Sequence, residues 1–141
     1  MPRVQLAGKA GAVTLDAAEA TATTTDTTVD GTTQTIVATL TSSLPAGTRI
    51  LLIGWVRLSV GATQTGASLT IRRGALITDA IVGEASAVSV TGSATDQLSL
   101  MAADTVLTEP QTYVLTVTQS GGGANSGNAE AAVLLALPLV R

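Results

Sequence analysis

Short apolar stretches separated by turn signals fill the chain from Thr35 onward, and this pattern limits the chain to a small set of folds. Clusters rich in glycine, proline and serine divide the stretches, and no long segment carries the 3.6-residue period of an amphipathic helix. Such a succession is typical of an all-β sandwich or barrel. It predicts about eight strands: Thr35–Leu40, Arg49–Val60, Ser68–Arg73, Leu76–Val82, Ala87–Thr91, Gln97–Ala102, Thr112–Gln119 and Ala129–Leu137.

Residues 1–34 have a different character. They are rich in threonine and alanine, with a low-complexity stretch over 17–34, and their aliphatic residues are too sparse to build a core. We expect an extended N-terminal arm with short strands at Val4–Leu6 and Val13–Leu15; a disordered tail is the alternative. The predicted organisation is therefore an arm over 1–34 and a β-sandwich over 35–141.

The predicted strand Arg49–Val60 is apolar on both faces. Alternate side chains define its core face: Ile50, Leu52, Val56, Leu58 and Val60. The opposite face begins with Leu51, Ile53 and Trp55, and becomes polar only at Arg57. The outer face of a strand in a lone antiparallel sandwich is normally polar. These three residues therefore indicate a second burial partner.

The last predicted strand repeats this anomaly. One of its faces carries Ala131, Val133, Leu135 and Leu137, and the other carries Ala132, Leu134 and Ala136. The predicted strands Gln97–Ala102 and Thr112–Gln119 instead alternate conventionally, with Leu98 and Leu100 inward on the first. Two explanations stay open: copies of the chain associate through these faces, or the arm folds back over them within one molecule.

Charge and hydropathy exclude two classes of partner. The formal net charge is −3, so the chain lacks the basic surface that nucleic-acid binding requires. Its only adjacent basic pair, Arg72–Arg73, is a small anion contact or, more simply, an exposed residue beside an ion-paired one. The longest apolar run, over 131–140, has ten residues and includes Pro138, whereas a membrane-spanning helix needs about 20. We expect no secretory signal at the N-terminus, because it lacks an apolar core of about 7–15 residues.

The residue types needed for common enzyme chemistry are missing. The chain has no histidine and no cysteine, which excludes Ser-His and Cys-His arrangements and zinc-thiolate sites. The single lysine, Lys9, lies in the arm, and no pair stands out among Asp79, Glu84, Asp96 and Asp104. Asp26 and Asp30 lack the spacing of a calcium loop, although a loop calcium ion stays an alternative. We therefore predict no catalytic residue, metal or cofactor.

The C-terminal two thirds resemble trimeric jelly-roll domains of the tumour-necrosis-factor-like type, which occur in bacteriophage head-fibre, tail and capsid-decorating proteins. Three pieces carry the resemblance: LPAGTRILLIGWVRLSV over 44–60, SLTIRRG over 68–74, and PQTYVLTVTQSGGGANSGNAEAAVLLAL over 110–137. The resemblance implies a jelly-roll sandwich and a homotrimer packed through apolar outer faces. It places that interface at Leu51, Ile53, Trp55, Leu134 and Ala136.

The same resemblance implies that the arm binds the shell. Its residues that would contact the major capsid protein are Pro2, Arg3, Val4, Leu6, Val13 and Leu15. The leading hypothesis is thus a capsid decoration protein, made in the host cytoplasm and placed on the capsid surface, which stabilises the shell without catalysis. The alternatives are a head- or tail-fibre tip that binds a host glycan or protein, and a small β-sandwich hydrolase that uses carboxylates.

A heat-adapted source would fit the low asparagine content and the absence of cysteine. A GC-rich genome explains the same bias, because the scarce residue types have AT-rich codons. The composition therefore favours thermostability, and a heat-adapted source and a GC-rich genome both stay open as its cause.

Overall fold

The computed structural model describes residues 4–6, 13–15, 19–23, 27–29, 33–59, 66–88, 95–120 and 127–140, and every regular element among them is a strand. The strands are β1 (Val4–Leu6), β2 (Val13–Leu15), β3 (Glu19–Thr23), β4 (Thr27–Val29), β5 (Thr35–Ser42), β6 (Arg49–Ser59), β7 (Gly66–Arg73), β8 (Ala80–Val88), β9 (Thr95–Thr105), β10 (Gln111–Ser120) and β11 (Gly127–Val140). The predicted all-β class is confirmed.

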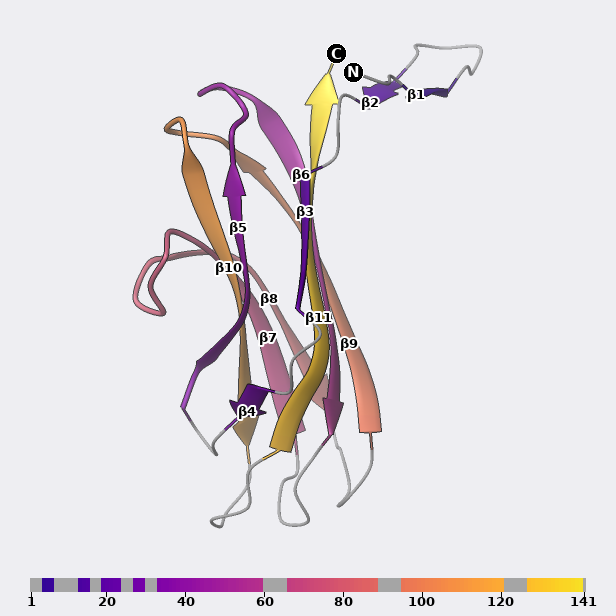
Figure 1. Cartoon of the computed structure of the whole chain (residues 1–141), viewed down its shortest axis with the longest axis vertical. Helices are drawn as coiled ribbons and strands as arrows, with labels where there is room; N and C mark the ends of the chain where they lie inside the picture. The colour runs from indigo at the N-terminus through magenta and orange to yellow at the C-terminus, as the bar shows by residue number, and fades with distance from the viewer. Residues whose placement is uncertain are drawn as a thin grey trace.

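Two antiparallel sheets face each other in a sandwich (Figure 1). One has the order β1-β2-β11-β6-β9, with β3 and β4 also paired to β11, and the other has the order β5-β10-β7-β8. From β4 onward the chain crosses to the opposite sheet at each step, except at the β7–β8 hairpin. This path is the jelly-roll arrangement of two interlocked Greek keys.

Strands β3 and β4 belong to the sandwich, whereas the sequence assigned their residues to an arm. β3 pairs with β11 over Ala132–Ala136, and β4 pairs with it over Gly127–Ala129, so together they flank β11 on the side away from β6. Val29 is fully buried in the core. The pair supplies the first strand of the jelly roll, and the sandwich therefore begins before the predicted boundary at residue 35.

The two short strands predicted at Val4–Leu6 and Val13–Leu15 are confirmed as β1 and β2. They pair with each other, and β2 pairs with the end of β11 through Leu139 and Val140. Figure 1 shows this hairpin beside the end of β11, away from the body of the sandwich. Pro2 and Arg3, predicted to contact a capsid with this segment, lie outside the described residues.

One stretch of the strand prediction was wrong. Residues 74–79 form a turn, and a single strand, β8, follows it in place of the two predicted strands Leu76–Val82 and Ala87–Thr91. Gly74 adopts a φ of 134°, which favours glycine, and the Asp79 side chain accepts a hydrogen bond from the amide of Leu76 at 2.8 Å. Residues 89–91 lie outside the described residues. The other strands agree with the prediction, with ends that differ by a few residues.

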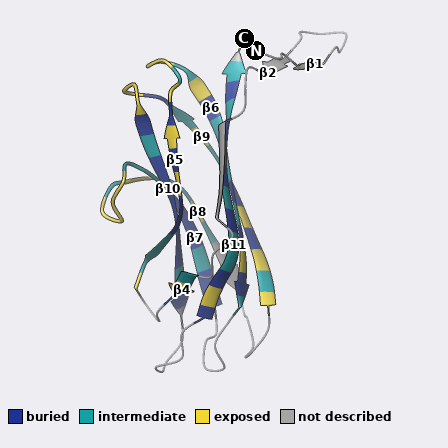
Figure 2. Ribbon diagram, in the orientation of Figure 1, coloured by how far each residue is buried: buried dark blue, intermediate teal, exposed yellow. Residues whose placement is uncertain are grey.

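The core lies between the sheets and follows the predicted alternation (Figure 2). In β6, Ile50, Leu52, Val56 and Leu58 are fully buried, as predicted. Gly54 continues this face because a Cβ atom there would lie 2.6 Å from Leu115 Cδ1 of the opposite sheet. Leu98 and Leu100 of β9 also point inward, as predicted. The missing side chain at Gly54 is thus the space that Leu115 fills.

Candidate functional site

The outer face of the β11-β6-β9 sheet is the candidate functional surface, because it has no charge across three consecutive rows. In each row a residue of β11 pairs with one of β6, which pairs in turn with one of β9. The nine residues, named the outer patch from here on, are Val133–Trp55–Ser99, Leu135–Ile53–Met101 and Leu137–Leu51–Ala103. The side chains from β6 and β11 are half-buried, and those from β9 are exposed.

The structure places three of the five predicted interface residues on the outer patch, namely Leu51, Ile53 and Trp55. Leu134 and Ala136 are wrong for this role, since both are fully buried in the core. The register explains the error: Leu134 pairs with Gly54 and Ala136 with Leu52, and both of these β6 residues face inward. The patch residues of β11 are therefore Val133, Leu135 and Leu137. Their part in an interface stays a proposal.

Met101 completes the outer patch and is not among the predicted interface residues. It is 69% exposed and lies beside Ile53 in the middle row. Its orientation could have been predicted, because Met101 continues the outward alternation of Gln97 and Ser99 along β9. Since those two residues are polar, this face of the strand was not recognised as apolar.

Charged side chains mark both ends of the outer patch. At one end the Arg57 Nε atom donates to Glu130 Oε2 at 2.9 Å. At the other end Arg49 is exposed and has no ion-pair partner among the described side chains. Beside it a surface depression of about 210 Å³ is lined by Arg49, Ala103, Asp104 and Thr105. The patch is thus a bounded uncharged area rather than part of a wholly apolar surface.

A second apolar feature lies at the 74–79 loop, which joins two strands of the opposite sheet. Leu76 is 61% exposed at this loop, and Ile77 and nearby Ile81 are also exposed. The loop backbone is nevertheless fixed, because the Gly74 amide donates to the Thr112 carbonyl at 2.8 Å and Arg72 Nη1 donates to the Asp79 carbonyl at 2.7 Å. The loop therefore presents large aliphatic side chains on a rigid support, an arrangement that lowers the entropic cost of binding.

The Asp79 carboxylate holds this loop, so replacing it by alanine should release the Leu76 amide. We expect Asp79→Ala to lower the free energy of unfolding by about 1 kcal/mol, the usual value of one such hydrogen bond. Hydrogen exchange of the Leu76 amide should accelerate strongly. Thr78→Ala, at an exposed position of the same loop, is the control and should change neither quantity. Unchanged Leu76 protection in Asp79→Ala would contradict this account of the loop.

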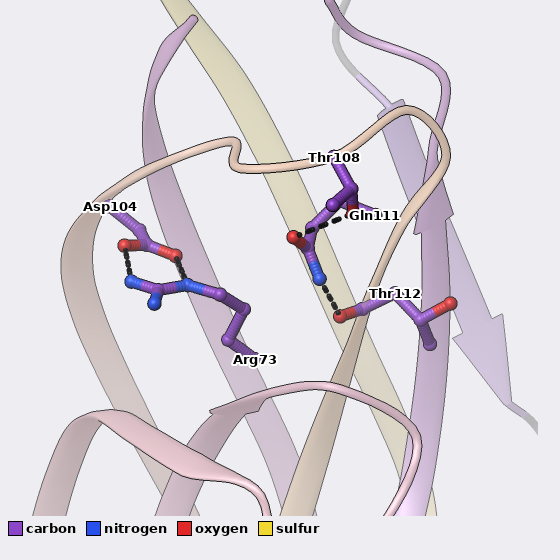
Figure 3. A network of polar contacts seen from close by, with 5 residues as sticks. All are labelled: Arg73, Asp104, Thr108, Gln111 and Thr112. Atoms are coloured by element: carbon purple, nitrogen blue, oxygen red, sulfur yellow. Dashed lines mark hydrogen bonds and ion pairs between the residues drawn. The ribbon is translucent and has the colours of Figure 1, made fainter. Parts of the chain in front are cut away.

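A partly buried ion pair joins the two sheets near the β9–β10 connection (Figure 3). Arg73 of β7 donates from Nε to Asp104 Oδ2 at 2.8 Å, and its Nη2 donates to Asp104 Oδ1. The Asp104 side chain is only 6% exposed, and that of Arg73 is 26% exposed. The Tyr113 side chain is fully buried nearby. Of the two explanations for Arg72–Arg73, the structure bears out the ion pair, which Arg73 makes, but Arg72 is half-buried and not exposed as predicted. Arg72 donates to Gln34 Oε1 at 2.9 Å and to the Asp79 carbonyl.

The environment of this network shifts three pKa values. Burial alone would raise the pKa of Asp104, but hydrogen bonds from Arg73 and the Thr105 amide, with the guanidinium charge, outweigh it and lower that pKa. The hydrogen bond to Asp104 raises the pKa of Arg73. Burial, and then the Asp104 charge, raise the pKa of Tyr113. At neutral pH, Asp104 and Arg73 therefore stay charged and Tyr113 stays protonated, which suits a structural role for the network.

Beside the ion pair, polar side chains brace the turn before β10. Thr108 Oγ1 donates to Gln111 Oε1 at 3.2 Å, and Gln111 Nε2 donates to the Thr112 carbonyl at 3.3 Å (Figure 3).

Among the described residues, no group of three or more acidic side chains could hold a metal ion. Lys9, Asp26 and Asp30 lie outside the described residues. In the same part of the chain, no helix has the length and hydropathy to cross a membrane.

No protein-family model and no curated protein matches the chain. Solved structures of the VP2 protein of infectious bursal disease virus do match. VP2 from T=1 particles gives a TM-score of 0.58 at 11% identity, over 96% of this chain and 36% of that chain. The Gt strain structure gives 0.58 at 13% identity, over 100% and 43%. A VP2 subviral particle gives 0.51 at 12% identity, over 99% and 38%.

The chain thus spans less than half the length of the viral chains it matches. At these identities the likeness shows the fold alone. That fold is a jelly-roll-like β-sandwich of the kind found in a viral capsid protein.

Proposed function

We propose that the chain is a structural protein of a virion, and more specifically a bacteriophage capsid decoration protein that stabilises the assembled shell without catalysis. One observation carries the proposal: a sandwich that shares its fold with VP2 keeps an uncharged, apolar patch on the outer face of one sheet. Contiguous apolar patches rimmed by polar residues on a protein surface mark protein–protein contacts. The proposed location is the capsid surface, after synthesis in the host cytoplasm.

The outer patch would join copies of the chain to one another. The tumour-necrosis-factor-like resemblance implies a trimer around a threefold axis, with Leu51, Ile53 and Trp55 at its contacts. A decoration protein that binds the shell but not its separated subunits adds free energy only to the assembled form. Several copies held together also bind with a raised effective concentration.

Two segments are proposed to contact the major capsid protein. The first is the β1–β2 hairpin, with Val4, Leu6, Val13 and Leu15, which extends away from the sandwich. The second is the 74–79 loop, whose exposed side chains lie on the sheet opposite to the outer patch. Because the two apolar surfaces lie on different sheets, one can face other copies while the other faces the shell.

Co-sedimentation tests the proposed function. The purified full chain should sediment with shells assembled from the major capsid protein of the same genome, and should raise the temperature at which those shells dissociate. Leu76→Ser with Ile77→Ser should fold normally, because both side chains are exposed, yet bind shells more weakly by about tenfold or more. Thr78→Ala is the matched control. A chain that neither self-associates nor sediments with shells would overturn the proposal.

A further inference from the structure

We propose that the free edge of β9 binds an extended segment of the major capsid protein, which adds to the sheet as a further strand and places an acidic side chain at Arg49. The inference rests on the proposed function in taking the major capsid protein as the partner. It goes further by fixing where that partner binds, in which conformation, and which side chains it needs there.

Strand β9 is the last strand of its sheet, and among the described strands it pairs only with β6 (Figure 1). Edge strands of native proteins are commonly protected from further pairing by a short length, a bulge, proline or lysine. β9 has none of these four features, because it has 11 residues, a continuous register with β6, and no proline or lysine. Another strand can therefore pair with this edge.

The register with β6 determines which backbone groups of β9 point to the open side. The Val106 amide donates to the Thr48 carbonyl at 2.9 Å, so these two residues form a hydrogen-bonded pair. In an antiparallel ladder such pairs alternate with pairs whose amide and carbonyl groups point away from each other. Counted back along β9, the residues with outward groups are Thr95, Gln97, Ser99, Met101, Ala103 and Thr105.

Two aspartates bind the amides at the ends of this row. Asp96 Oδ1 accepts from the Gln97 amide at 2.8 Å, and the Asp104 carboxylate accepts from the Thr105 amide. The amides between them, named the open amides from here on, belong to the exposed residues Ser99, Met101 and Ala103. They span about 14 Å and, with their carbonyl groups, match the backbone of an extended polypeptide.

The side chains beside the open amides define the chemistry of the added strand. Met101 is 69% exposed, and an apolar side chain of the added strand would lie next to it and cover it. Further along the same face, Arg49 is exposed beside Thr105 and lines the depression of about 210 Å³. An acidic side chain would pair with Arg49 there. The Asp104 carboxylate does not oppose this, because Arg73 binds it on the inner face.

The charges of β9 disfavour a second copy of this strand as the occupant. In an antiparallel pair of two such edges centred on Met101, Asp96 of each copy would lie diagonally across from Asp104 of the other, a contact of like charges. An added strand also leaves the outer patch accessible to other copies. The open amides point sideways within the sheet, whereas the patch side chains point away from it.

Hydrogen exchange resolved to single residues tests the inference without any substitution. In the free full chain the open amides should exchange fast, whereas the amides of Leu98, Leu100 and Ala102, which point to β6, should exchange slowly. When the chain is bound to shells assembled from the major capsid protein of the same genome, exchange of the open amides should slow by at least about tenfold.

Substitutions test the two parts of the site separately. Ser99→Pro removes one open amide and no hydrogen bond to β6, so it should fold, which urea unfolding verifies, and bind shells about tenfold more weakly. Ser99→Val keeps the amide and is the matched control. Arg49→Gln should weaken binding about threefold. Arg57→Gln, which removes the same charge at the opposite end of β6, should leave binding unchanged.

The outcomes separate this inference from the proposed function. Slower exchange of the open amides on shells, with weaker binding of Ser99→Pro than of Ser99→Val, supports it. A chain that sediments with shells while its open amides exchange as in the free chain would overturn the inference alone. Open amides that exchange slowly in the free chain at high concentration, and faster on dilution, would overturn it in favour of pairing between copies. A chain that does not sediment with shells would overturn both.

Discussion

Replacing Asp104 by asparagine is expected to lower the free energy of unfolding by about 3 kcal/mol, the lower end of the cost of breaking a buried ion pair. The substitution leaves the Arg73 guanidinium in place, but removes the carboxylate that accepts from its Nε and Nη2 atoms. The lower end applies because the Arg73 side chain keeps 26% of its exposure to water. Urea denaturation at neutral pH measures the loss.

The pH dependence of this difference follows from the lowered pKa of Asp104. A carboxyl group with a lowered folded-state pKa stabilises the protein fully above its ordinary pKa, about 3.9, and that stabilisation is lost as the pH falls through the folded value. The free energies of unfolding of wild type and Asp104→Asn should therefore differ by a constant amount near neutral pH and converge in acid.

Two control variants make the result specific to the ion pair. Glu84→Gln removes an exposed carboxylate and should leave stability within about 0.5 kcal/mol of wild type. The double variant Arg73→Met with Asp104→Leu replaces both partners by apolar groups and should recover much of the loss. If the Asp104→Asn variant has the same free energy of unfolding as Glu84→Gln, the ion pair does not stabilise the packing of the two sheets.

The alternation of β6 explains why much of the fold could be predicted from sequence. Ile50, Leu52, Val56 and Leu58 follow the two-residue period of a strand, and the structure buries all of them. The unusual apolar character of the opposite face was equally visible in Leu51, Ile53 and Trp55. Local period is a property of the strand itself and needs no knowledge of its neighbours.

The orientation of β11 could not be predicted in the same way. Both of its faces are apolar, so period alone does not say which one is core. The choice depends on register with β6, where Leu134 meets Gly54 and Ala136 meets Leu52. A slip of one residue reverses every side chain, and register is set by contacts distant in sequence. The predicted interface residues on this strand were wrong for that reason.

The first strand of the jelly roll, formed by β3 and β4, could not be predicted from its amino-acid composition. β3 and β4 consist mainly of threonine, alanine and valine, and neither has the aliphatic alternation of a core strand. They join the sandwich through backbone pairing with β11, which side-chain hydropathy does not report. The ion pair of Arg73 with Asp104 was hidden likewise, because it joins residues of opposite sheets.

Replacing Leu115 by alanine is expected to lower the free energy of unfolding by about 3 kcal/mol, within the range for buried leucine. Leu115 is fully buried in β10, and its Cδ1 atom occupies the space left by the absent side chain of Gly54. Leu107→Ala, at a site that is largely exposed, is the control and should change stability little. Thermal or urea unfolding of both variants gives the comparison.

Gly54→Ala alone should also destabilise the fold, by about 1–3 kcal/mol, because its new Cβ atom would lie 2.6 Å from Leu115 Cδ1 and force that side chain to move. The two substitutions should not add. In the Leu115→Ala background the clash disappears and the new methyl group fills part of the cavity, so Gly54→Ala should be neutral or stabilising there. A double-mutant cycle measures this coupling. Strictly additive losses would mean that the two residues do not share one space, and would contradict the packing of β6 against β10.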